Sequence, residues 1–68
     1  MNTFGKGIVR RVRIKQSPVS RWLFRHAGKE CDAIFYPDSG FKPQIYASQL
    51  DASIPDMQTV SENDIEIL

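Results

Sequence analysis

The sequence is short of cysteine and histidine, and these shortages exclude several kinds of site. A lone cysteine, Cys31, cannot form an intrachain disulfide. Together with the lone histidine, His26, it falls short of the ligand set of a structural zinc site. No Gly-rich phosphate loop or metalloprotease motif occurs either. We therefore expect neither a metal nor a cofactor.

Long apolar runs are also missing. No stretch approaches the about 20 apolar residues of a membrane-spanning helix. The opening residues, MNTFGKGIVRR, lack the apolar middle region of a signal peptide. An unpaired thiol is typical of a reducing compartment. These absences predict a cytoplasmic protein without a membrane partner.

The chain is short, with 68 residues, and we expect residues 1–68 to form a single domain. A core of this size leaves a thin margin of stability. The fold must therefore rest on that core or on association with another chain, so a homo-oligomer stays open. Gly5 and Gly7 loosen the backbone, which predicts that residues 1–6 are a flexible lead-in.

Charge is distributed unevenly along the chain. Residues 1–29 contain no acidic residue, and residues 30–68 contain no base except Lys42. Two explanations remain open. Either basic and acidic strands pair across a sheet and stabilise each other modestly, or the basic half presents a face to phosphate or to an acidic protein.

Residues 7–15, GIVRRVRIK, are β-branched and basic, and their alternation predicts a first strand. Val12 and Ile14 lie on its apolar face. Arg10 shares their parity, and a bulge near Arg10 would correct this flaw in the pattern. The opposite face presents three cations: Arg11, Arg13 and Lys15.

The segment after this strand allows two interpretations. Ser20 and Gly28 would cap a short helix over RWLFRHA. Such a helix is too short to be stable without packing. We favour an ordered loop in which Trp22 and Phe24 fill the core.

Later segments alternate clearly. Residues 30–36 predict a strand with Cys31, Ala33 and Phe35 on its inner face. Pro37-Asp38-Ser39-Gly40 predicts a turn, and residues 41–47 predict the second strand of a hairpin. After a tight turn at residues 61–64, a last strand places Ile65 and Ile67 inward.

This arrangement resembles the SH3-like barrel. The resemblance is carried by Val12-Arg13-Ile14, Trp22, Gly28-Lys29-Glu30 and the ending Ser61 to Leu68. It implies an all-β fold, a small SH3-like barrel of about five short antiparallel strands. The layout is similar to the small barrel subunit of photosystem I and to the barrel chain of ferredoxin–thioredoxin reductase, which support protein docking.

A second resemblance is local. Thr3-Phe4-Gly5-Lys6-Gly7 and Gln44-Ile45-Tyr46 look like the type II dihydrofolate reductases, which are also SH3-like barrels. The resemblance implies a homotetramer whose pore, lined by Gln44, Ile45 and Tyr46, binds NADPH and dihydrofolate, with Lys15 as a basic group. That family ends soon after the Gln-Ile-Tyr stretch, whereas Ser48 to Leu68 follow it here.

No catalytic residue is predicted. A cysteine nucleophile needs a nearby base and an electropositive setting. Cys31 instead has the parity of a core residue, and we expect His26 to be a solvated surface group. The sequence therefore favours a protein that is not an enzyme.

Basic and aromatic residues provide the candidate binding site. Guanidinium groups and aromatic rings are typical of interface hot spots. We interpret the chain as a non-catalytic binding module that docks an acidic protein partner, within a larger assembly or as a homo-oligomer. A nucleic-acid-binding barrel and the reductase are the alternatives. The predicted site residues are Arg11, Arg13, Lys15, Arg21, Arg25 and Tyr46.

Overall fold

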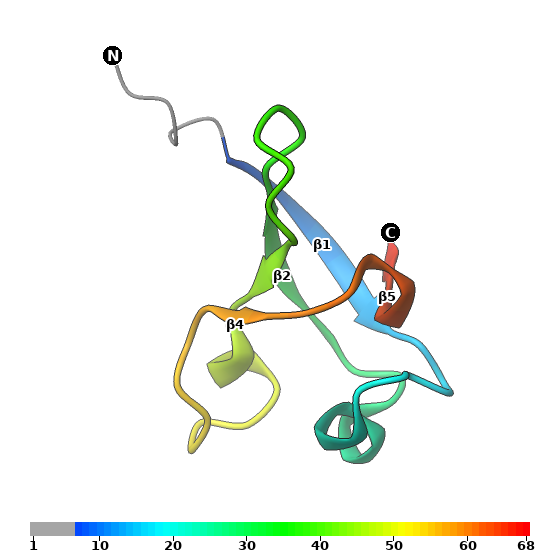
Figure 1. Cartoon of the computed structure of the whole chain (residues 1–68). Helices are drawn as coiled ribbons and strands as arrows, with labels where there is room; N and C mark the ends of the chain where they lie inside the picture. The colour runs from blue at the N-terminus through cyan, green and yellow to red at the C-terminus, as the bar shows by residue number, and fades with distance from the viewer. Residues whose placement is uncertain (1–6) are drawn as a thin grey trace.

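A computed structural model describes residues 7–68 and shows a mostly β fold, with five antiparallel strands in one sheet (Figure 1). The order across the sheet is β4-β3-β2-β1-β5. The predicted lead-in, residues 1–6, lies outside the described residues. The strands are β1 Ile8–Ile14, β2 Glu30–Phe35, β3 Gln44–Ile45, β4 Gln58–Thr59 and β5 Ile65–Ile67.

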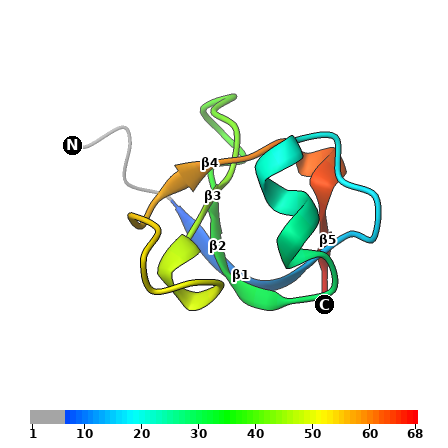
Figure 2. The same cartoon turned by 90° about the horizontal axis from the view of Figure 1, so that it is seen from below.

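Short 3₁₀-helices connect these strands. They are η1 Arg21–His26 between β1 and β2, η2 Ala47–Gln49 after β3, and η3 Glu62–Asp64 before β5. Figure 2 shows η1 packed beside the end of the sheet where β5 lies. The tight turn predicted at residues 61–64 is confirmed as η3.

The pairing of β1 with β2 is regular, so the predicted bulge at Arg10 is wrong. The register runs without interruption from Ile8 opposite Phe35 to Arg13 opposite Glu30. Arg10 lies opposite Ala33 and is exposed. The start of β1 extends away from the 3₁₀-helices (Figure 1). Because residues 7–68 leave the inner face open there, Arg10 can keep the parity of Val12 and still lie in water, and no bulge is needed.

The core gathers the inner-face residues of the sheet, as alternation predicted for Val12, Ile14, Cys31 and Ala33. Each of these four side chains is fully buried. The inward position predicted for Ile67 is wrong, because its side chain is 56% exposed. Ile67 lies in an edge strand, with no neighbouring strand on one side. The buried apolar cluster also includes Leu23, Ile45, Ala47, Leu50, Val60 and Ile65.

The segment RWLFRH is a 3₁₀-helix rather than the favoured loop, and Trp22 and Phe24 do not fill the core. Trp22 is 37% and Phe24 54% exposed. A 3₁₀-helix has about three residues per turn, so side chains at i and i+3 share a side. Leu23 and His26 are the pair that this spacing turns inward, and both are buried.

A buried carboxylate holds the loop before η1 against the end of the chain. Asp64 is fully buried and accepts hydrogen bonds from the backbone N–H groups of Val19, at 2.7 Å, and Ser20, at 3.1 Å. The backbone carbonyl of Asp64 also accepts a bond from the N–H of Lys15 at 3.0 Å. One residue therefore fixes β1, η1 and η3 relative to each other.

The hydrogen bonds also set the charge state of Asp64. Burial by itself would raise the pKa of this carboxyl, but the bonds from Val19 and Ser20 and the charge of Lys15 outweigh it and hold the pKa below the ordinary 3.8. The folded state therefore favours the carboxylate. Its contribution to stability is present above pH 3.8 and is lost as the pH falls through the lowered folded value.

We expect Asp64→Asn to destabilise the fold by about 2 kcal/mol at pH 7, because the amide presents N–H groups where two acceptors are needed. Urea unfolding followed by circular dichroism measures the effect. The gap from the native protein should narrow as the pH falls below 3.8, because the unfolded chain then binds a proton that Asp64 in the folded protein resists. Glu62→Gln, an exposed neighbour in η3, is the control. Equal midpoints for Asp64→Asn and the native protein would contradict this role.

Candidate functional site

The arginines predicted on the outer face of β1 are paired with the chain's own carboxylates. Arg13 contacts Glu30 at 3.1 Å between Nη2 and Oε2, and Arg11 contacts Asp32 at 3.3 Å between Nη1 and Oδ1. Longer contacts of 3.8 Å join Arg11 to Glu30 and Arg13 to Glu66. For Arg11 and Arg13, the first explanation of the charge asymmetry therefore holds: basic and acidic strands pair across the sheet.

These ion pairs follow from the strand register. Arg13 lies directly opposite Glu30 on β2 and Glu66 on β5, and Arg11 lies opposite Asp32. The side chains are about half exposed, so each pair contributes roughly 0–1 kcal/mol to stability. The acids beside Arg11 and Arg13 nevertheless offset the positive potential that these two arginines give to this face of β1.

The remaining predicted residues lie in separate places. Lys15 is exposed just after β1, and Arg21 and Arg25 are exposed on η1. Tyr46 is half-buried at the end of β3, where its N–H donates to the carbonyl of Asp32. Figures 1 and 2 show η1 apart from the junction of β3 and η2, so Tyr46 does not join the arginines of η1.

The outward side of η1 combines cations with aromatic rings. With about three residues per turn, Arg21 and Phe24 form one stripe, and Trp22 and Arg25 form the next. All four side chains are exposed, and within residues 7–68 neither arginine forms an ion pair. We call these four residues the η1 face.

Contacts within η1 and just after it position the η1 face. The rings of Trp22 and His26 meet edge to face, with centroids 6.3 Å apart and an interplanar angle of 68°. The N–H of Ala27 closes the helix on the carbonyl of Phe24, and Gly28 follows with a φ of 83°. The predicted role of Gly28 as the residue that ends this turn is thus consistent with its backbone.

His26 is buried, so the prediction of a solvated surface group is wrong. Its Nδ1 atom lies 3.3 Å from Nζ of Lys29, which also donates to the carbonyl of Leu50 at 3.4 Å. Burial lowers the pKa of His26, and the positive charge of Lys29 lowers it further. The ring is therefore a neutral acceptor for Lys29 near pH 7.

Cys31 is a core residue, as its parity predicted. It is fully buried, and burial raises the pKa of its thiol from 9.0 to about 11. The nucleophilic form of cysteine is the thiolate, which this environment disfavours. In the described part of the chain, histidine, cysteine and acidic side chains form no group that would hold a metal ion.

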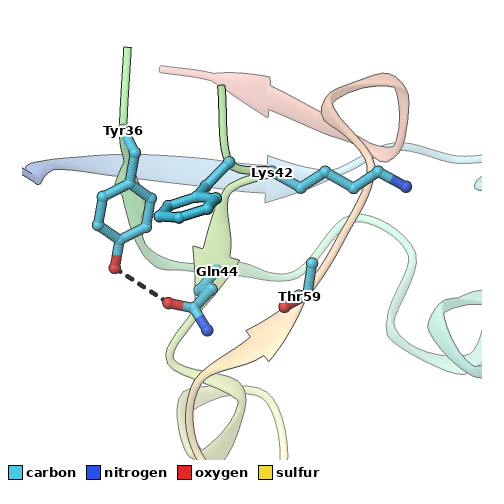
Figure 3. A pocket seen from close by; sticks show the side chains of 5 residues that line it. Tyr36, Lys42, Gln44 and Thr59 are labelled. Carbon is cyan, nitrogen blue, oxygen red and sulfur yellow. Dashed lines mark hydrogen bonds between the residues drawn. The ribbon is translucent and has the colours of Figure 1, made fainter. Parts of the chain in front are cut away.

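A cleft lies on the outer face of the sheet, away from the paired arginines. It has a volume of about 470 Å³ and is lined by Tyr36, Phe41, Lys42, Gln44 and Thr59 (Figure 3). We call it the aromatic cleft. Residues 41–47 were predicted as one strand, but only Gln44–Ile45 form β3, and its pairing with β2 and β4 brings Gln44 next to Thr59.

Only part of the Gln-Ile-Tyr stretch reaches this cleft. Gln44 lines it, whereas Ile45 points to the opposite side of the sheet and is fully buried. Tyr46 is not among the lining residues. Within residues 7–68, Gln44 and Ile45 therefore face opposite sides of the sheet and do not line one cavity together.

Comparison of the chain with protein-family models, with curated proteins and with solved structures finds no match. Among residues 7–68, no helix has the length and apolar character needed to cross a membrane.

The thiol of Cys31 is expected to be protected in the folded protein. A rise in pKa from 9.0 to about 11 lowers the thiolate fraction about 100-fold at pH 8. Reaction with a chromogenic disulfide reagent should be slow in buffer and fast in urea. The chain has one cysteine, so the signal is unambiguous. Rapid labelling of the folded protein would contradict a buried thiol.

Stability should fall as the pH decreases below 6.5, because the unfolded chain gains a proton on His26 that the folded chain accepts only at lower pH. Urea unfolding between pH 7.5 and 5.5 measures this loss. His26→Gln, which does not titrate, should show a flatter profile. A His26 pKa at or above 6.5 by NMR would contradict the lowered value.

Proposed function

We propose that this chain is an SH3-like small barrel that acts as a non-catalytic binding module, with the η1 face docking an acidic protein partner. The strand order and the 3₁₀-turn before β5 support the barrel architecture. The observation that carries the function is the exposure of Trp22 and Phe24 beside two arginines that form no ion pair with any of residues 7–68. A small domain with few core residues gains no stability from leaving such rings in water.

The chemistry of the η1 face fits an acidic protein segment with apolar residues. Trp and Arg are the residues that most often dominate binding energy at protein interfaces. Arg21 and Arg25 would attract the carboxylates of the partner. Phe24 and Trp22 would cover the partner's apolar side chains that lie between those carboxylates. Residues 16–29 contain no acid, so the face has no acidic competitor within its own segment.

A nucleic acid fits this face less well. The η1 face holds only two cations, and Arg11 and Arg13 on the sheet already contact acids. Arg21 and Arg25 would neutralise about two phosphates, compared with about six to ten in typical DNA-binding proteins. Such a face would bind an oligonucleotide weakly at physiological salt.

Charge reversal on η1 tests the proposal. We expect Arg21→Glu/Arg25→Glu to weaken capture of an acidic partner from nuclease-treated extract of the native host by about tenfold or more. Arg10→Glu, on the exposed start of β1, is the matched control and should retain capture. The isolated partner should then change the fluorescence of Trp22, the single tryptophan.

Two results would reject this function. Equal capture by the native protein and the η1 double variant would remove the η1 face from the interface. Binding of a random oligonucleotide that weakens steeply with salt, with no acidic protein captured, would favour the nucleic-acid alternative.

A further inference from the structure

The aromatic cleft offers a site that is independent of the η1 face. Its walls are the rings of Tyr36 and Phe41, which meet edge to face with centroids 6.1 Å apart at 80°. The side chain of Gln44 forms its floor, and the Thr59 hydroxyl lies nearby (Figure 3). Lys42 also lines the cleft, and its ammonium group points away from Tyr36 and Gln44 (Figure 3). The volume of about 470 Å³ is typical of sites for small molecules.

The polar groups of the cleft are held in a defined arrangement. The Tyr36 hydroxyl donates to Oε1 of Gln44 at 3.0 Å. This bond orients the amide, whose Nε2 group carries two N–H donors. The Thr59 hydroxyl is a further donor or acceptor, opposite Gln44 in the pairing of β3 with β4. The floor of the cleft thus presents hydrogen-bonding groups beneath the aromatic walls.

A glycine just before β1 leaves room for the Tyr36 ring. A Cβ atom on Gly7 would lie 2.5 Å from Cγ2 of Ile34 and 3.2 Å from Cε1 of Tyr36. A larger residue at position 7 would therefore clash with the Ile34 side chain and crowd the Tyr36 ring. Packing against Gly7 and the bond to Gln44 together pre-organise the ring, which lowers the entropic cost of binding.

The charge of the cleft has one sign. Lys42 is the only charged residue among the five that line it, and none of them is acidic. Within residues 7–68, Lys42 takes part in no ion pair. A cation beside aromatic walls and amide donors favours a ligand that joins a flat ring to a negative group.

We propose that the aromatic cleft binds a small molecule in which a planar aromatic ring carries a phosphate or a carboxylate. The ring stacks against Phe41 and Tyr36, and its polar edge bonds to Gln44 and Thr59. The anionic group pairs with Lys42. The site differs from a reductase pore, because Ile45 lies on the buried side of the sheet and Tyr46 outside the cleft.

Titration of the ¹⁵N-labelled protein with AMP and with benzoate, followed by NMR, tests the proposal. Adenosine supplies the ring without the anion, and ribose 5-phosphate supplies the anion without the ring. We expect shifts confined to residues of the cleft, with at least one of AMP and benzoate binding about fivefold or more tightly than either fragment.

Variants separate the two parts of the site. Lys42→Gln should weaken binding of the anionic ring about fivefold and leave adenosine unchanged, because a partly exposed ion pair has a modest strength. Phe41→Ala should weaken the binding of both the anionic ring and adenosine. Lys15→Gln, an exposed lysine outside the cleft, is the matched control. Retained dispersion of the spectrum shows that each variant is folded.

The proposal is overturned if neither AMP nor benzoate shifts the resonances of the cleft at about 10 mM, the limit of weak binding. It is also overturned if Lys42→Gln binds AMP and benzoate as tightly as the native protein does. Because the η1 variants leave the cleft intact, loss of partner capture and loss of ligand binding are distinguishable outcomes.

Discussion

The buried carboxylate of Asp64 is the constraint on which the arrangement of this small fold depends. A charged group without exposure is tolerated only when its hydrogen bonds are satisfied. Here the N–H groups of Val19 and Ser20 supply them. These bonds anchor the loop before η1, and their loss would leave two partly buried backbone donors without their acceptors. The position of η1, and therefore of the face that it exposes, follows from this contact.

Three regions of the surface formed by residues 7–68 differ in their balance of charge. On the outer face of β1 and β2, arginines and carboxylates lie opposite one another and offset each other's fields. On η1, cations alternate with aromatic rings and have no acid in the same segment. The aromatic cleft has a single cation and no acid. In these latter two regions, no carboxylate of residues 7–68 forms an ion pair with the cations.

Sequence patterns were most reliable where a residue's position depends on local geometry. Alternation correctly assigned Cys31 and Ala33 to the inner face, because successive side chains of a strand point to opposite sides. It failed for Arg10 and Ile67, which have the right parity but lie where the inner face is open to water. The two aromatic residues of η1 were placed in the core because hydrophobicity alone does not reveal a period of about three residues.

The sequence by itself determined that the chain is mostly β, that its thiol is a core residue, and that its cations and acids are segregated. These properties depend on composition and on the period of a strand. Tertiary structure decided which cations are compensated and which side chains gather into a cleft. Arg13 meets both Glu30 and Glu66 through strand register, and Tyr36, Gln44 and Thr59 meet only after three strands pair. Register joins residues distant in the chain, and no local pattern specifies it.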